Sequence, residues 1–429
     1  MKNAATRGQP RALAEIESMI LGRAPHAVML VGPGSTGKTT LAFDLAAGLL
    51  CTDPDPAARP CRVCWGCRHV ASGNHPDLHR LVPEGPAGQV KIGDHRAPEP
   101  GTVRHLLGEL ALLPAAGGAR VAIVEQAHRL NEAAQNALLK MLEEPPAGVT
   151  MILCADDEEC LLPTVRSRCA RVRVGAVGGR EIERWLEELE AADAPRAARL
   201  ARLAEGRPGL ALAYARSPDA ERIRGELARG VLDMLPQRRA ARLASVRELM
   251  KSAVALEAAL DASRSSAPTA ADAAAPVAVR GRKGRGAKAA APSAGPDVAD
   301  DAVGDATPED AAAPKLAASE RRSAATTLLE VWASVGRDLA VAGAGGARQL
   351  RELALVDEVD AAAPAVSPST LTTFLARLAQ IAAQLDEMVN PELALDVLAM
   401  SWPRTEPAVQ DPGARPAPAG TTAPASRPR

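Results

Sequence analysis

One eight-residue segment constrains the fold of this chain more than any other feature. Residues 32–39 read Gly-Pro-Gly-Ser-Thr-Gly-Lys-Thr and fit the phosphate-binding P-loop pattern without a mismatch. An apolar run from Ala27 to Val31 precedes the loop, and a helical pattern from about Lys38 to Leu50 follows it. A buried strand, a glycine-rich turn and a helix are the setting in which this pattern binds phosphate. The segment therefore predicts an α/β domain of nucleotide-binding ancestry.

Each residue type in this loop has a physical role in binding a phosphate. Glycines let backbone N–H groups approach phosphate oxygens, and the N-terminus of the following helix adds a favourable dipole. Lys38 would reach the outer phosphates, and the Thr39 hydroxyl would bind Mg²⁺. A glycine-rich turn without a ligand is the alternative. The residues predicted to bind ATP and Mg²⁺ are Gly32, Gly34, Gly37, Lys38, Thr39 and Thr40.

Strand and helix patterns alternate along the first 175 residues. Apolar strand patterns recur at 121–124, 151–154 and 171–174, and amphipathic segments at 102–113 and 131–144 lie between strands. This alternation predicts a mostly parallel sheet that helices cover on both faces. Beyond Gly179 the pattern is helical only, in segments 179–215, 218–262, 319–342 and 368–402.

Two segments lack the large apolar side chains that a packed core needs. Residues 263–317 consist mainly of Ala, Pro, Ser, Gly and Asp, and residues 403–429 are rich in Pro, Ala and Thr. Such segments cannot bury enough surface to offset their ordering entropy, so we predict a disordered linker and a disordered tail. A basic run at 280–288 could contact DNA phosphates weakly, although a solvated run of charges is the simpler interpretation.

The overall composition excludes several classes of protein. Aromatic residues make up 2% of the chain, which argues against base-stacking platforms for single-stranded nucleic acid. The formal net charge is −1, so the whole molecule is not a polyanion binder. The chain contains no run of eighteen apolar residues, so the sequence predicts no transmembrane helix. Residues 1–10 lack the apolar core of a signal peptide. We therefore expect a cytoplasmic protein whose cysteines stay reduced or bind metal rather than form disulfides.

Four cysteines form a pattern typical of a metal site. Cys51, Cys61, Cys64 and Cys67 follow the spacing C-x₉-C-x₂-C-x₂-C. Four thiolates at this spacing can close a tetrahedral Zn²⁺ site, and the absence of an open ligand position indicates a structural rather than a catalytic role. A redox dithiol, which usually uses one C-x-x-C at a helix N-terminus, is the alternative.

The acidic residues expected of an ATPase are only partly present. After the second strand an Asp-Glu pair would hold Mg²⁺ and orient water, but this chain has Glu125 and Gln126. Glu125 could still hold magnesium as a degenerate Walker B residue, whereas Gln126 is neutral and cannot act as a base. We predict weak or absent hydrolysis. Arg168, in Ser167-Arg168-Cys169, could pair with a surface carboxylate or act as an arginine finger on a neighbouring nucleotide.

Taken in order, these segments resemble the AAA+ subunits of bacterial DNA polymerase III clamp loaders, of the delta-prime and gamma/tau types. The resemblance covers about residues 8–215, and a short match near the end of the last helical segment extends it. The motifs that carry it are Arg23 to Ala27, the P-loop, the four cysteines, His75-Pro76-Asp77, Asn136 to Pro146, Ser167-Arg168-Cys169 and Asn390 to Leu395.

The resemblance implies a fold, partners and roles for particular residues. The expected fold is an AAA+ α/β core at 1–175 with a Cys₄ zinc insert at 51–67, then a helical lid at 176–215. A helical collar at 216–262 and 318–402 would complete it. The implied partners are delta and gamma/tau subunits, the sliding clamp and, through the complex, primed DNA. Arg168 would act in trans on the ATP of an adjacent gamma/tau subunit.

Three departures separate this chain from the hydrolysing gamma/tau type. Glu125-Gln126 replaces Asp-Glu, Asp156 stands where a γ-phosphate-sensing Thr is expected, and Gly209 stands where a sensing Arg is expected, with Arg207 nearby. All three favour a delta-prime-type stator, although the retained P-loop favours some nucleotide binding. A gamma/tau-type motor is the alternative, and DNA binding through the zinc module and the basic run is a third.

Overall fold

The computed structural model describes residues 1–83, 90–94, 96–116, 118–265, 318–346, 349–386 and 389–405. The chain divides into two compact units, the first formed by Met1–Arg222 with Val254–Ala324 and the second by Ile223–Ala253 with Ala325–Arg429. Among the described residues no helix is long and apolar enough to cross a membrane. The predicted linker and tail lie outside these residues except at 263–265 and 403–405. The predicted limits of core, lid and collar stay predictions.

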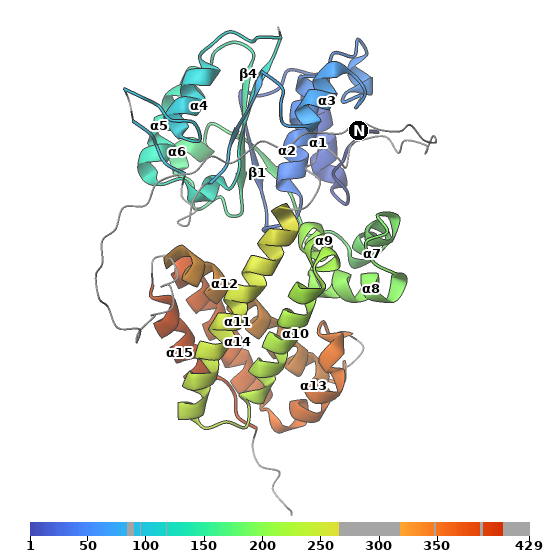
Figure 1. The fold of residues 1–429 in the computed structure, drawn as a ribbon, viewed down its shortest axis with the longest axis vertical. Helices are drawn as coiled ribbons and strands as arrows, with labels where there is room; N and C mark the ends of the chain where they lie inside the picture. The colour runs from blue at the N-terminus through green and yellow to red at the C-terminus, as the bar shows by residue number, and fades with distance from the viewer. Residues whose placement is uncertain are drawn as a thin grey trace, which may run out of the picture. The chain divides into compact units, whose positions relative to one another are not determined.

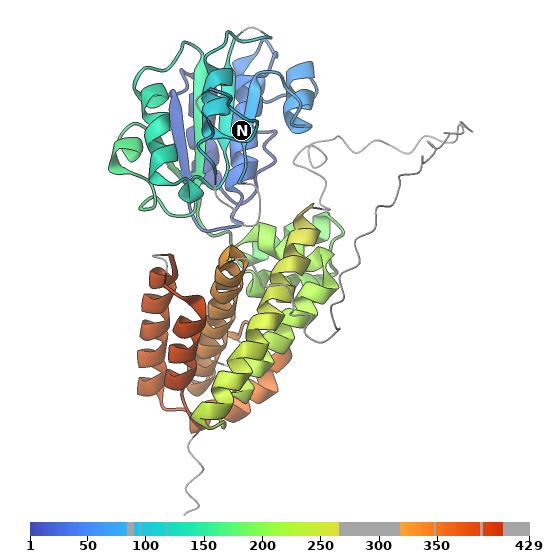
Figure 2. The ribbon, with the colours of Figure 1, turned by 60° about the vertical axis from the view of Figure 1, so that its left-hand side comes forward.

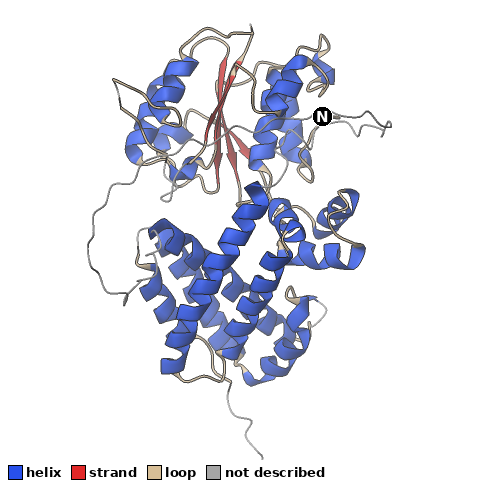
Figure 3. Ribbon diagram, viewed as in Figure 1, coloured by secondary structure: helices blue, strands red, loops and turns tan. Residues whose placement is uncertain are grey.

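A parallel sheet forms the centre of the first unit (Figures 1 and 3). β1 pairs with β4, where Val31 lies opposite Ala155, and with β5, where Val31 lies opposite Arg173. Because the strands are parallel, their carboxyl ends meet at one edge of the sheet, where ligands bind in such folds. In the spatial order β2-β3-β4-β1-β5, the strands are β2 (Leu78–Leu81), β3 (Arg120–Val124), β4 (Val149–Ala155), β1 (Ala27–Val31) and β5 (Ala170–Arg173).

Helices cover both faces of this sheet, as the strand patterns predict (Figure 1). Alternate β1 residues face opposite layers: Val28 joins a core with α1–α3, and Met29 joins a core with α4–α6. The first layer contains α1 (Pro10–Leu21), α2 (Lys38–Leu49), η1 (Pro56–Ala58) and α3 (Trp65–Ala71); the second contains α4 (Val103–Leu110), η2 (Ala127–Arg129), α5 (Glu132–Glu143) and α6 (Pro163–Arg166).

β2 is a strand that the sequence pattern did not reveal. Its four residues, Leu-His-Arg-Leu, are apolar only at the two ends, and only those ends are buried. The strand lies at the edge of the sheet and pairs with β3 alone, so Leu78 lies opposite Val121. A short edge strand with a polar centre carries neither a continuous apolar run nor a clear alternation, which is why the pattern reads as loop.

Three short helices follow the sheet within the first unit: α7 (Gly179–Glu188), α8 (Ala194–Leu203) and α9 (Pro208–Arg216). The Asp193 side chain caps α8 by accepting from the Arg196 N–H at 3.3 Å, and a proline follows at the first turn. Apolar stripes of α7 and α8, including Ile182, Leu186 and Leu200, are buried. The helical pattern predicted from Gly179 onward is therefore observed.

The second unit is helical, and its orange-to-red helices lie side by side (Figures 1 and 2). Trp332 packs against Phe374 with ring centroids 5.8 Å apart, and Phe374 packs edge-on against Trp402 at 4.6 Å. Leu371, Phe374 and Leu378 recur at helical spacing and are buried in the core of this unit. The remaining elements are α10 (Pro218–Asp233), α11 (Arg239–Ser265), α12 (Ala318–Gly343), η5 (Leu353–Leu355), α13 (Val356–Ala362), η6 (Ala363–Ala365), α14 (Pro368–Asp386) and α15 (Pro391–Ser401); α10–α12 have residues in both units.

A buried guanidinium joins two ends of this helical unit. Arg242 is 1% exposed and donates hydrogen bonds to the Met234 carbonyl at 2.9 Å, Leu235 at 3.0 Å and Pro403 at 2.7 Å. Burial lowers the pKa of Arg242 to about 10, which leaves it charged at neutral pH. The interaction satisfies carbonyls at the end of α10 and after α15, where helices leave carbonyls without intrahelical donors.

Candidate functional site

The P-loop lies where its sequence predicts, at the carboxyl end of β1 and the start of α2. The Gly32 N–H donates to the Ala155 carbonyl at 3.3 Å, which ties the loop to β4. A Cβ atom at Gly32 would lie 1.8 Å from the Val174 carbonyl oxygen, so packing alone requires glycine there. Gly37 has φ +102° and caps α2, with open space around its Cα. Thr39 and Thr40 lie half-buried in the first turn of α2.

Lys38, the residue predicted to reach phosphates, has three close oxygen partners inside the chain. Its Nζ lies 2.7 Å from the Gly32 carbonyl, 2.7 Å from the Pro33 carbonyl and 2.8 Å from Asp156 Oδ1. The Lys38 side chain is 8% exposed, whereas that of Asp156 is 45% exposed. An ammonium group has three hydrogen-bond donors. All three therefore have acceptors within the loop and the end of β4.

Asp156 lies directly beside the glycine-rich turn. Its Oδ2 would be 3.2 Å from a Cβ atom placed on Gly34. The Asp156 N–H donates to His128 Nδ1 at 3.2 Å, so the backbone of this residue is fixed by a side chain that follows β3. The sequence departure at Asp156 is thus part of the phosphate-binding edge, and it places a negative charge where the ligand would also be negative.

Glu125, the degenerate acidic residue, forms an ion pair with a residue that sequence reasoning missed. Arg80 donates to Glu125 Oε1 from Nε at 3.1 Å and from the terminal nitrogen at 2.6 Å. The Arg80 guanidinium also lies 5.1 Å from the Phe43 ring centroid. Because Arg80 comes from the unpredicted strand β2, no local signal linked it to Glu125. The pairing reduces the charge that Glu125 could offer to a magnesium ion.

Gly209, which stands at the expected position of a sensing arginine, contacts the P-loop through its backbone. Its N–H donates to the Ser35 carbonyl at 3.0 Å, and a Cβ atom there would lie 3.1 Å from the same oxygen. The nearby Arg207 instead donates from Nε to the Ala204 carbonyl at 3.2 Å. Helix α9 therefore approaches the phosphate loop closely, but it does so with a backbone amide rather than a cation.

Arg168 lies just after α6 and is accessible to solvent. Its side chain is 35% exposed, and it pairs with Glu143 at 2.8 Å and donates to the Thr164 carbonyl at 2.9 Å. Its partner Glu143 ends α5, whose core lies on the opposite face of the sheet from that of α2, which begins at Lys38. The structure thus shows the surface ion pair that was the simpler interpretation. An exposed pair of this kind is weak, so a partner phosphate could displace Glu143.

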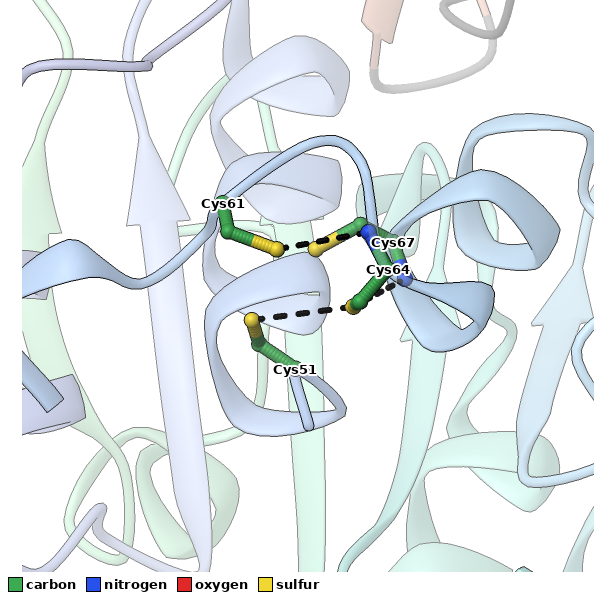
Figure 4. A group of neighbouring side chains, drawn as sticks. All are labelled: Cys51, Cys61, Cys64 and Cys67. Atoms are coloured by element: carbon green, nitrogen blue, oxygen red, sulfur yellow. Dashed lines mark hydrogen bonds between the residues drawn. The ribbon is translucent and has the colours of Figure 1, made fainter. Parts of the chain in front are cut away.

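The four predicted metal-binding cysteines converge in the structure (Figure 4). All four Sγ atoms lie within 4.8 Å of one another, and the Cys51 and Cys64 sulfurs are 3.8 Å apart. A tetrahedral zinc site with Zn–S bonds of about 2.3 Å has sulfur–sulfur edges of about 3.8 Å. The donor set therefore fits a structural Zn²⁺ ion. The residues are Cys51 at the end of α2, Cys61 and Cys64 before α3, and Cys67 within α3.

The thiols of this cluster differ in their tendency to ionise. Burial opposes ionisation of Cys64, but hydrogen bonds with the backbone of Cys67 and Thr52 outweigh it and lower the pKa of this thiol to about 6. Burial raises the pKa of Cys51 and of Cys67. A metal ion would have to draw the proton from these buried thiols, because thiolates are its ligands.

Buried charges anchor the segments on either side of the cluster. Asp44 of α2 is fully buried, pairs with Arg62 and accepts the N–H groups of Ala5 at 3.0 Å and Thr6 at 2.9 Å. Gly66 sits where a Cβ atom would lie 2.3 Å from the Leu50 carbonyl oxygen. These contacts hold the cysteine segment against the end of α2, which is a structural arrangement rather than a catalytic one.

Two histidines near the cluster, His69 and His75, pack against Trp65. Trp65 stacks on His69 at 4.1 Å and meets the buried His75 edge-on at 5.1 Å. His75 Nδ1 accepts the Asp77 N–H at 3.1 Å, and burial lowers the pKa of His75. The motif His75-Pro76-Asp77 thus leads from the cysteine segment into β2.

Comparison with known proteins gives relatives for the first part of the chain. The family described as "DNA polymerase III, delta subunit" matches residues 8–177. The chain is 37% identical over 171 residues to the delta-prime subunit of Pseudomonas aeruginosa and 38% identical over 200 residues to that of Escherichia coli. It is also 35% identical over 205 residues to the Escherichia coli tau subunit.

These alignments cover limited parts of this chain and of each relative. They span 39%, 46% and 46% of this chain and 49%, 57% and 30% of the three relatives, in the same order. The chain therefore spans about half the length of the delta-prime relatives it matches. Over that part, the predicted resemblance to delta-prime subunits of DNA polymerase III is confirmed. The predicted fold class is confirmed in its parallel α/β core with a P-loop, its four-cysteine cluster and its helical C-terminal region.

Proposed function

We propose that this chain is the delta-prime-type stator of a bacterial clamp loader, a cytoplasmic complex associated with the replisome. In this role it assembles with gamma/tau and delta subunits, and the complex places a sliding clamp on primed DNA. The observation that carries the proposal is that the charged groups beside the P-loop already have partners within the chain. Lys38 and Glu125 are each paired with a residue of the chain, and Gly209 replaces a cation.

The loss of motor function follows from the contacts of Lys38 and Glu125 and from the neutral side chain of Gln126. Hydrolysis needs a lysine free to bind phosphate, an acidic residue free to bind magnesium and a group that orients water. Lys38 has three internal acceptors, Glu125 binds Arg80 and Gln126 is neutral. The chain would therefore hydrolyse ATP weakly or not at all, although its loop could still bind ATP and Mg²⁺.

Arg168 is the residue proposed to contribute to catalysis, by acting on a neighbouring subunit. An arginine placed beside a γ-phosphate stabilises the charge that develops during phosphoryl transfer. Arg168 is held by an exposed ion pair with Glu143, by the Thr164 carbonyl and by the Ser167 hydroxyl at 3.3 Å, so its guanidinium can exchange partners at low cost. We propose that it leaves Glu143 and contacts ATP bound to an adjacent gamma/tau subunit.

The four cysteines are proposed to hold a structural Zn²⁺ ion. The sulfur geometry fits tetrahedral coordination, and all four ligand positions would be filled by thiolates. Such an ion would link the end of α2 to the start of α3 and fix the segment between them. The ion would therefore contribute to folding rather than to chemistry.

Two observations favour the second candidate function, an ATP-hydrolysing gamma/tau-type motor. The P-loop keeps every residue of its pattern, and the match to the Escherichia coli tau subunit is nearly as strong as those to delta-prime subunits. The motor interpretation requires Lys38 and Glu125 to exchange their partners when nucleotide binds. A turnover experiment on variants of this chain separates the two candidates.

The test is ATP turnover by a reconstituted clamp loader that carries Arg168→Ala in this chain only. We expect a loss of about a hundredfold or more in clamp- and DNA-stimulated turnover at the affected site, because an arginine finger contributes on this scale. Arg168→Lys should rescue little, since Lys cannot reproduce the planar guanidinium. Arg166→Ala is the matched control, because Arg166 ends α6 two residues before Arg168 and pairs with exposed Glu159 at 3.7 Å. Equal turnover in Arg168→Ala and Arg166→Ala would exclude the finger.

A further inference from the structure

The end of β4 carries a residue that competes with the ligand of its own P-loop. We propose that Asp156 acts as an internal substitute for a phosphate on Lys38, so that the chain holds its nucleotide site closed until this carboxylate is displaced. The inference rests on the proposed non-hydrolysing role, and it names the residue that sets the loop's affinity for nucleotides. Its ligand class is a nucleoside di- or triphosphate.

The hydrogen-bond inventory of Lys38 shows why the site is closed. The ammonium group has three donors, and the Gly32 carbonyl, the Pro33 carbonyl and Asp156 Oδ1 accept within 2.8 Å. A phosphate oxygen must therefore replace one of these acceptors. Asp156 is the only anionic one among them, and it would lie beside the incoming phosphate as a like charge. Its removal relieves both the competition and the repulsion.

The side chains of Lys38 and Asp156 differ in their freedom to move. Lys38 is buried at the start of α2, whereas the Asp156 side chain is 45% exposed and can rotate into water. The Asp156 backbone is held by His128 Nδ1, so the residue stays at the loop while its carboxylate exchanges. Oδ2 also lies close to Gly34, over the turn whose N–H groups would bind phosphate. The carboxylate is thus placed to block both parts of the phosphate site.

The experiment measures binding of a fluorescent ADP analogue to the full chain, with and without Mg²⁺, by wild type, Asp156→Asn and Asp156→Ala. We expect both variants to bind about tenfold more tightly, since each removes the carboxylate that occupies Lys38 and a like charge next to phosphate. Asp157→Asn is the matched control, because it removes the same charge one residue away, and its Oδ1 only accepts the Glu159 N–H at 2.9 Å. Lys38→Ala combined with Asp156→Asn should abolish the gain.

Each outcome decides the proposal. Tighter binding in both Asp156 variants but not in Asp157→Asn supports it. Unchanged binding shows that Asp156 does not compete, and weaker binding that depends on Mg²⁺ shows that Asp156 is instead a metal ligand; either result overturns the proposal. Because this binding assay uses the chain alone, its failure is distinct from that of the arginine-finger test in the assembled complex.

Discussion

The P-loop and the cysteine cluster are both complete motifs in the sequence. They differ in whether their functional groups already have charged partners within the chain. At the P-loop, Lys38 and Glu125 find charged partners within the chain at 2.8 and 2.6 Å. In the cluster, the sulfur atoms of four thiols converge within 4.8 Å, and a bound Zn²⁺ ion would neutralise the thiolates they would form. A motif whose charges are satisfied internally has little need of its ligand. A motif whose donors only face one another depends on its ligand to be stable.

The largest expected effect comes from removing one ligand of the cysteine cluster. Cys67→Ser should lose most of the bound Zn²⁺ and lower the free energy of unfolding by roughly 4 kcal/mol, because metal binding contributes directly to folding. Zinc content by elemental analysis and thermal unfolding measure both effects. Cys160→Ser, at an exposed cysteine outside the cluster, is the control. Equal zinc content in the two variants would show that the cluster is not a metal site.

Gly32→Ala tests whether the P-loop is kept for packing rather than for a ligand. The new Cβ would collide with the Val174 backbone, so we expect a loss of roughly 3 kcal/mol in stability without any nucleotide present. Gly37→Ala meets nothing within 4 Å and carries only the strain of a positive φ, about 1 kcal/mol. Urea unfolding of both variants gives the comparison. A larger loss in Gly37→Ala would contradict the packing explanation.

The pH dependence of alkylation tests the electrostatics of the metal-free cluster. Because the pKa of Cys64 is lowered to about 6, its thiolate persists as the pH falls through neutrality and is lost only near pH 6. Between pH 7 and 6 its modification rate should fall only about twofold, whereas that of a simple cysteine peptide falls about tenfold. Peptide mapping after timed alkylation measures this. A tenfold fall at Cys64 would show that its pKa is ordinary, and added Zn²⁺ should suppress the reaction.

Removing the partner of Glu125 should have a small effect on stability. Arg80→Ala breaks an ion pair whose side chains are 37% and 15% exposed, and we expect a cost of about 1 kcal/mol or less. ATP turnover by the isolated chain should not appear, because Gln126 still cannot act as a base. Arg171→Ala is a matched control, since its pair with Glu158 is similarly exposed and does not involve Glu125. Turnover gained in Arg80→Ala alone would show that the pair suppresses a working motor.

The sequence predicts those features of the P-loop and the cysteine cluster that depend on residues close together in the chain. It does not predict contacts between residues far apart in the chain. The P-loop, the cysteine spacing and the buried strands are local patterns, and the structure places them as predicted. The pair of Arg80 with Glu125 joins residues 45 positions apart through a strand without a clear pattern. The contact of Lys38 with Asp156 likewise depends on the order of β1 and β4 in the sheet. Such contacts are set by tertiary packing, which no local pattern encodes.

The most direct test of this contrast is Lys38→Ala in this chain alone, within an otherwise wild-type reconstituted clamp loader. Because Lys38 is already paired inside the chain, we expect clamp- and DNA-stimulated ATP turnover to stay within about twofold of wild type. The same preparation should lose turnover when Arg168 is replaced. If Lys38→Ala abolishes turnover and Arg168→Ala does not, the P-loop of this chain is a working motor site and the contrast between its two motifs is wrong.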